Sequence, residues 1–307
     1  MSLDHSILES HMTSDTQNEI ASRFWGSGSC QSCHLRSYFQ YYTEQYMIIY
    51  QSYKAQLPLK THQDILEIAT DILDNLPRSE VKEKFMRRCT SRDSAVDDAL
   101  DSSIDLAVRL VFMLDVGVFR HVFSAPLSHD SLKLGRDFNV SSMVRIAGFK
   151  VELTSNLTDH LRLRDAKRTV TVFHHASFLK SQQQSMFFPT GFIDKTLATL
   201  ALLFPKGDRS CEKWYKKQGA SDELDDHVLK CGPAQRRIDE YNYWHDRLVI
   251  LKEEFDESRP STLSQWWNDR REGTQWYTLW VAISLTLVFG LFQSITGAMQ
   301  AYKSYHP

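Results

Sequence analysis

The sequence of 307 residues lacks a strong charge of either sign, and it lacks the cysteine density of a secreted scaffold. Its formal net charge is −2, so the global charge gives no reason to expect nucleic acid as a partner. Its five cysteines are odd in number and scattered, whereas disulfide-stapled secreted domains are shorter and richer in cysteine. We therefore expect the bulk of the chain to stay in a reducing compartment.

Targeting and catalytic motifs are absent as well. Residues 1–24 carry acids, Ser and Thr but no apolar run of a secretory signal peptide, and they are too acidic for a transit peptide. No Walker loop, GxGxxG, HExxH or GxSxG motif occurs, and no internal repeat stands out. We expect a flexible head over residues 1–29 and a protein with no catalytic site and no cofactor. A hydrophobic content of 42% is enough for a packed core.

What the sequence does have is one long apolar segment near its C-terminal end. No charged residue occurs in the 24 positions from Trp276 to Met299. As a helix this segment would measure about 36 Å, enough to cross a hydrocarbon core of about 30 Å. A buried core helix, the alternative, is usually shorter and rarely has aromatic residues at both edges. We predict a transmembrane helix over 276–299 and a short polar tail over 300–307.

The residues flanking this segment predict how it sits in a membrane. The aromatic residues expected at the two interfaces are Trp266, Trp267, Trp276, Tyr277, Trp280 and Tyr302. Arg259, Arg270 and Arg271 precede the segment and only Lys303 follows it, which favours a cytoplasmic N-terminal part. The pattern predicts a tail-anchored, single-pass protein. A tail with one lysine favours the endoplasmic reticulum over the mitochondrial outer membrane.

Small residues recur at every fourth position of the apolar segment. They are Ala282, Thr286, Gly290, Ser294 and Ala298. On a helix we expect them to form one narrow ridge, along which two copies could pack as a homodimer. The alternative is that small residues are simply common in membrane helices.

The part before the segment is predicted to be mainly α-helical. In a helical region over 30–137, tyrosines at helical spacing over 36–57 indicate a core-facing stripe, and Thr61 and Ser79 are expected to cap the next two helices. At 138–205 the order helix, strand, helix, turn, strand predicts a small α+β module like a winged helix. Residues 206–231 are predicted to be a charged loop, and 232–275 long amphipathic and juxtamembrane helices.

Three stretches carry a resemblance to a known group of proteins. They are IAGFKVELTSNLTDHLRL, VTVFHHASFL and YWHDRLVILKEEFDESRPSTLSQWWNDRREGTQWYTLWVAI, within residues 138–305. This region resembles a large group of uncharacterised fungal proteins that share the Trp-rich juxtamembrane stretch and a terminal hydrophobic anchor. The resemblance implies the anchor and the order of elements, and it implies no activity.

A Cys-x-x-Cys-His pattern occurs at Cys30, Cys33 and His34. This pattern attaches haem in c-type cytochromes, but the chain has no signal that would take it to a compartment where haem is attached. Zinc needs four ligands, usually as two close pairs, and Cys211 and Cys231 make no second pair because nineteen residues separate them. A redox dithiol would need a preceding strand. A loop that enters the tyrosine-rich helix is the plainer interpretation, with a weak metal site as the alternative.

Two other clusters are candidates for chemistry. Basic residues at the expected turn of the winged-helix-like module, Arg162, Arg164, Lys167 and Arg168, could contact phosphate, or they could form a solvated turn. His174 and His175 lie on an expected strand, so one should point inward and the other outward. Without a nucleophile and an orienting acid, we interpret both histidines as structural.

Two asparagines, Asn139 and Asn156, stand in Asn-x-Ser/Thr glycosylation sequons that would stay unmodified in the cytoplasm. The sequence as a whole predicts a membrane-tethered cytoplasmic protein that acts as an adaptor or scaffold, with the lipid bilayer and an unidentified protein as partners. The alternative is a zinc-binding or nucleic-acid-binding winged-helix module tethered to a membrane.

Overall fold

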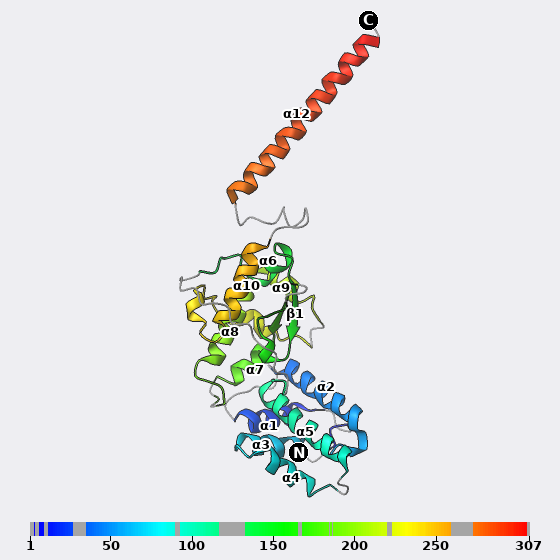
Figure 1. Cartoon of the computed structure of the whole chain (residues 1–307), viewed down its shortest axis with the longest axis vertical. Helices are drawn as coiled ribbons and strands as arrows, with labels where there is room; N and C mark the ends of the chain where they lie inside the picture. Colours follow the sequence, from blue (N-terminus) through cyan, green and yellow to red (C-terminus); the bar gives the residue numbers. More distant parts are fainter. Residues whose placement is uncertain are drawn as a thin grey trace. The chain divides into compact units, whose positions relative to one another are not determined.

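The computed structural model describes residues 3, 6–8, 12–26, 35–89, 93–116, 133–164, 168–183, 185, 187–219, 223–258 and 273–305, with the backbone alone at 55, 273–276, 303 and 305. The chain divides into two compact units. The first spans Met1–Val144 and Phe149–Glu257, and the second spans Arg145–Gly148 and Ser258–Pro307. As expected, the chain is mainly helical and has one small sheet (Figure 1).

Helices α1 to α5 occupy one half of the first unit (Figure 1, blue to cyan). Their bounds are Ser14–Trp25 (α1), Arg36–Tyr53 (α2), His62–Leu73 (α3), Arg78–Met86 (α4) and Ser94–Phe112 (α5), with a short 3-10 helix, η2, at Lys54–Gln56. Thr61 caps α3 as predicted, in a capping box with Asp64. Ser79 does not cap α4, which begins at Arg78 after Pro77, because the fixed φ of proline suits a helix start and its missing N–H costs nothing there.

The tyrosine stripe of α2 packs into the core as its spacing indicates. Tyr38, Tyr42 and Tyr46 are buried, and each hydroxyl has a partner. Tyr38 donates to the Leu110 carbonyl oxygen of α5 (2.6 Å), Tyr46 donates to the Leu59 carbonyl oxygen (3.1 Å), and the Tyr42 hydroxyl lies 3.1 Å from His62 Nδ1. These bonds satisfy polar atoms that would be costly to bury unpaired, so α2 is fixed against its neighbours.

The sheet has three strands, β1 (Lys150–Thr154), β2 (Arg162–Arg164) and β3 (Thr169–Phe173), in the order β1-β3-β2. Strand β1 runs parallel to β3, and β2 is antiparallel to it. The β-branched run of β3 is buried at every position, as befits a central strand. Strands β1 and β3 lie within the two segments predicted as strands, residues 149–154 and 169–179. Strand β2 was not predicted, because a three-residue strand after the 3-10 turn η3 (Leu157–Asp159) is too short to show alternation.

The chain leaves the sheet earlier than predicted, because the segment predicted as a strand extends over residues 169–179. Strand β3 ends at Phe173, and helix α7 begins at Ala176. His174 and His175 therefore lie between a strand and a helix, where strand alternation no longer applies, and both are buried. The prediction that one of them points outward is wrong.

The remaining elements of the first unit are helical. They are α6 (Val140–Arg145), α7 (Ala176–Ser181), α8 (Phe192–Leu203), α9 (Arg209–Tyr215), η5 (Asp226–Lys230), η6 (Ile238–Glu240) and α10 (His245–Glu257). The segment predicted as a charged loop contains α9 and η5. Asp208 caps α9 by accepting from Ser210 N (2.8 Å) and Cys211 N (3.1 Å). The predicted amphipathic helix after residue 232 is shorter than expected, although its apolar face is buried.

Aromatic contacts join the helical region to the sheet module within the first unit. Trp25 of α1 packs edge-on against Phe178 of α7, with 5.4 Å between ring centroids, and Tyr38 stacks on the same ring at 6.0 Å. Trp25 Nε1 also donates to the Val111 carbonyl oxygen (3.1 Å). The regions predicted as 30–137 and 138–205 thus share one hydrophobic core.

Helix α12 (Gly273–Tyr305) is the main element of the second unit. Its stretch from Tyr277 to Tyr302 is long and apolar enough to cross a bilayer, at about 39 Å for 26 residues. The residues in the most apolar window of this stretch are not buried.

Candidate functional site

A pocket of about 310 Å³ opens beside the carboxyl ends of the parallel strands β1 and β3. Four segments line it, contributing Ser37, Gln40, Tyr41 and Glu44 from α2, Leu153 and Ser155 from β1 and its end, His174 and His175 from the end of β3, and Gln218, Glu223 and Leu224 after α9. The carboxyl ends of parallel strands are where open α/β sheets bind ligands, because the chain leaves the sheet there and its loops can diverge.

Two imidazoles form the deepest polar groups of this pocket. The rings of His174 and His175 lie 4.1 Å apart, and His175 Nε2 is hydrogen-bonded to Ser155 Oγ (2.9 Å). Burial lowers the pKa of His174 to about 4 and the pKa of His175 well below its usual value, so both rings are neutral at pH 7. The Nδ1 atoms of both rings are buried and have no hydrogen-bond partner within the described part of the chain.

The charged residues of the described lining are all acidic. Glu44 and Glu223 contribute carboxylates, and none of the described lining residues is a lysine or an arginine. Hydroxyl and amide groups make up most of the rest of the described lining, together with two leucines. The described lining therefore offers hydrogen-bonding groups and carboxylates rather than an apolar surface.

A buried Ser, Asp and His cluster lies at the start of α7 but lacks the geometry of a catalytic triad. Asp225 accepts from Ser177 N (2.5 Å), Ser177 Oγ (2.8 Å) and His227 N (2.9 Å). Ser177 Oγ and Asp225 Oδ1 both contact the same atom of His227, Nδ1, at 3.0 and 3.3 Å. In a triad the serine and the acid bind opposite ring nitrogens, so that the imidazole can relay a proton. Asp225 instead satisfies backbone and side-chain donors at the starts of α7 and η5.

Replacing this carboxylate should destabilise the fold strongly. In Asp225→Ala, the donors on Ser177 and His227 would lose their acceptor in a buried setting, at an expected cost of about 3 kcal/mol in the free energy of unfolding. Urea denaturation of the full chain in nonionic detergent would measure this cost. Asp226→Ala, at the exposed neighbouring position, is the matched control, and equal losses for the two variants would show that Asp225 has no such role.

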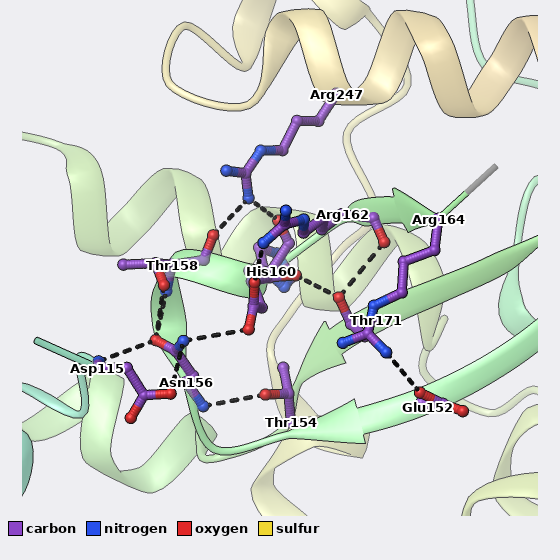
Figure 2. A network of polar contacts seen from close by, with 11 residues as sticks. Asp115, Glu152, Thr154, Asn156, Thr158, His160, Arg162, Arg164, Thr171 and Arg247 are labelled. Atoms are coloured by element: carbon purple, nitrogen blue, oxygen red, sulfur yellow. Dashed lines mark hydrogen bonds and ion pairs between the residues drawn. The ribbon is translucent and has the colours of Figure 1, made fainter. Parts of the chain in front are cut away.

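The basic turn is neutralised by carboxylates, as Figure 2 shows for Arg162 and Arg164. Arg162 Nη1 donates to Asp159 Oδ1 (2.8 Å), Arg164 lies 3.6 Å from Glu152, and Arg168 lies 3.9 Å from Glu254. Lys167 lies outside the described residues. Phosphate contacts would have to compete with these ion pairs, so the three arginines do not form a free basic patch.

Asn156 is the centre of the hydrogen-bond network in Figure 2. Its Oδ1 accepts from Thr158 N (3.1 Å) and Thr158 Oγ1 (2.8 Å). Its Nδ2 donates to Asp115 Oδ2 and to Asp159 Oδ2, each at 3.1 Å. Arg247 closes the network by donating to the carbonyl oxygens of Thr158 and His160. Every hydrogen-bonding atom of the Asn156 amide is thereby used to hold the turn between β1 and β2.

On α12 the five small residues lie at every fourth position of one helix, in a row that is inclined to the helix axis. Ala282, Thr286, Gly290, Ser294 and Ala298 are all exposed along one continuous helix. Each step of four residues turns 40° past a full turn, so the row winds around the helix by about 160° over its length. A straight partner helix would meet about three of these residues at a time. Of the aromatic residues, Tyr277 and Tyr302 are exposed near the two ends of the helix.

The other sequence-predicted sites cannot be placed. Cys30, Cys33, His34, Trp266 and Trp267 lie outside the described residues, and only the backbone is described at Trp276. Among the residues that the structure describes, no group of three or more His, Cys, Asp or Glu side chains could hold a metal ion. Of the pocket residues, His174 and His175 are recognisable as candidates in the sequence, whereas Tyr41, Glu44 and Ser155 are not, because only the fold brings these distant positions together.

Comparisons with known proteins identify no relative. No family model, no curated protein and no solved structure matches this chain.

Proposed function

We propose that this chain is a single-pass membrane protein, anchored by α12, whose first unit binds a protein partner at the cytoplasmic surface of the membrane. The observation that carries the proposal is α12 itself, where apolar side chains such as Leu287 (63% exposed), Phe289 (63%) and Phe292 (69%) have no protein to cover them. A helix that is apolar all round is stable in a bilayer but not in water. The aromatic residues at its ends suit the two interfaces.

The two glycosylation sequons support a cytoplasmic location for the first unit. Asn139 is buried, its Oδ1 accepts from Ser142 N (2.9 Å) at the start of α6, and the amide of Asn156 is fully engaged. A glycan on either amide nitrogen would conflict with the fold. The excess of arginine before α12 favours the same orientation, and the single lysine after it favours the endoplasmic reticulum.

The surfaces proposed for the partner are the winged-helix-like module over 138–205 and the Trp-rich stretch before α12. Phe187, at 47% exposed, and Tyr243, at 45%, are large apolar side chains exposed around α8 and could contribute to binding. Two copies could pair through α12 along the row of small residues, with the two helices crossing at an angle because the row is inclined to the helix axis. The paired arginines give no support to the nucleic-acid alternative.

Protease protection on sealed microsomes tests the proposed topology. With tags at both ends, the N-terminal tag should be digested and the C-terminal tag protected, while the protein should stay in the pellet after carbonate extraction. The protein should also be insensitive to endoglycosidase. A separate variant with a reporter sequon added after Tyr305 serves as the positive control, because that variant should be glycosylated and sensitive to endoglycosidase.

The reverse pattern would contradict the proposal. A protected N-terminal tag together with a glycan on Asn139 or Asn156 would place the first unit in the lumen. Release by carbonate would show that α12 does not span the bilayer.

A further inference from the structure

The pocket beside the ends of β1 and β3 contains buried polar groups without partners. Tyr38, Tyr42 and Tyr46 of α2 bond their hydroxyls to other parts of the protein, whereas Tyr41 of the same helix lines the pocket. Tyr41 is only 8% exposed. Buried polar groups are nearly always satisfied in folded proteins, so an exception at a pocket points to a ligand or bound water.

His174 and His175, which line the same pocket, have buried polar atoms without hydrogen-bond partners among the residues that the structure describes. His174 is 8% exposed and His175 is 2% exposed, and the Nδ1 of each lacks a partner within the described residues. Both residues line the pocket together with Tyr41, and the Tyr41 ring lies 5.9 Å from the His175 ring. One pocket thus holds two buried imidazoles whose Nδ1 atoms have no partner within the described residues, together with the largely buried phenol of Tyr41.

The charge of the lining selects the class of ligand. Anions such as phosphates or carboxylates are disfavoured, because the described lining has two carboxylates and no lysine or arginine. An acyl chain is disfavoured, because Leu153 and Leu224 are the only aliphatic residues of the described lining. The neutral imidazoles, the phenol and the carboxylates can all accept a hydrogen bond from an ammonium group.

We propose that this pocket binds a small alkylammonium ligand, a primary or secondary amine such as a short polyamine, through Glu44 at the rim and Tyr41, His174 and His175 inside. A volume of about 310 Å³ suits a ligand of this size. This inference goes beyond the proposed membrane function, and it stands or falls independently of the topology of the anchor.

Calorimetric titration of the full chain in nonionic detergent, at neutral pH, tests this assignment. Spermidine and putrescine should bind saturably at one site at millimolar concentration or below. Choline, which has no N–H donor, should bind more weakly, and citrate should not bind. Glu44→Gln should weaken spermidine binding about threefold, as expected for an exposed carboxylate. Tyr41→Phe should weaken it about fivefold, as expected for the loss of one hydrogen bond.

Glu253→Gln, which changes an exposed carboxylate outside the pocket, is the matched control and should leave the affinity unchanged. All three variants change surface or polar atoms with little loss of packing, so an unaltered unfolding transition can be checked first. The proposal is overturned if neither amine binds saturably, if citrate binds in preference, or if Glu44→Gln and Tyr41→Phe bind as tightly as the Glu253→Gln control.

Discussion

Acidification from about pH 7.5 to about pH 5.5 is expected to cost the fold about 5 kcal/mol of unfolding free energy, because four buried histidines are neutral in the folded state. Burial lowers the pKa of His62 to about 4, of His160 to about 3 and of His174 to about 4, and it lowers that of His175 well below its usual value. The positive charge of the nearby Arg247 also lowers the pKa of His160, and the neighbouring His174 also lowers the pKa of His175.

The sign follows from where each state takes up protons. In the unfolded chain these histidines take up protons near pH 6.5, whereas in the folded protein they do so only near pH 4 or below. Their contribution to stability is therefore complete above about pH 6.5 and is lost as the pH falls toward about 4. Each histidine contributes about 1.4 kcal/mol between the two pH values, and the total is a large share of a typical stability of about 5–15 kcal/mol.

His160 shows why protonation is so unfavourable. Its Nδ1 accepts a hydrogen bond from Phe173 N (3.1 Å), so the ring proton is on Nε2, which faces Thr199 Oγ1 at 2.7 Å. Thr199 donates its own hydroxyl proton to the Thr196 carbonyl oxygen (2.6 Å) and can therefore accept from the ring. A second ring proton would point at the Phe173 N–H and remove a bond next to β3.

Urea denaturation of the full chain across this pH range measures the linkage. In His62→Phe, the mean slope of unfolding free energy against pH over this range should decrease by about 0.7 kcal/mol per pH unit, because one proton-binding group has been removed. Ile68→Val is the control, since it shortens a buried side chain and lowers stability without changing the slope. A stability that is constant from neutral pH down to about pH 5 would refute the expectation for the wild-type protein.

Two arginines in the middle of α12 are expected to abolish membrane integration. In the double substitution Leu287→Arg and Phe289→Arg, each charge costs about 3 kcal/mol at the centre of a membrane helix, so the combined cost of about 6 kcal/mol corresponds to a more than ten-thousandfold change in the insertion equilibrium. Both side chains are exposed on the helix, at 63% each, so the change leaves the first unit's core intact.

Carbonate extraction of microsomes carrying the full chain gives the readout. The wild-type protein should remain in the pellet, and the double-arginine variant should be in the supernatant. Exchanging the two residues, as Leu287→Phe and Phe289→Leu, keeps the apolar character and should keep the protein in the pellet. Retention of the double-arginine variant in the pellet would argue against α12 as the anchor.

The elements that could be predicted from sequence are those with a long or regular pattern. The apolar run of α12, the tyrosine stripe of α2 and the β-branched β3 each carry their own periodicity or length. Helix α9 was missed because charged residues dominate it, and only two of its side chains, Cys211 and Tyr215, are buried. A helix that short derives its stability from tertiary packing and its Asp208 cap rather than from a visible apolar face.

The pocket could not be predicted from sequence at all. Its lining comes from four segments that only the fold brings together, and the polar atoms that define it are identified by the partners they lack. The tyrosines of α2 illustrate the difficulty, because Tyr41 and Tyr42 are adjacent in sequence. Tyr42 is paired with His62, whereas Tyr41 lines the pocket. No pattern in the sequence separates the two.

The engaged sequons have a consequence for biogenesis. A copy inserted in the reverse orientation would present Asn139 and Asn156 to the glycosylation machinery while the chain is still unfolded. A glycan at Asn139 would then have no room in the core, and one at Asn156 would take a donor from the turn between β1 and β2. Misoriented molecules would be unable to fold, so they would be removed by quality control rather than accumulate as a second, lumenal population.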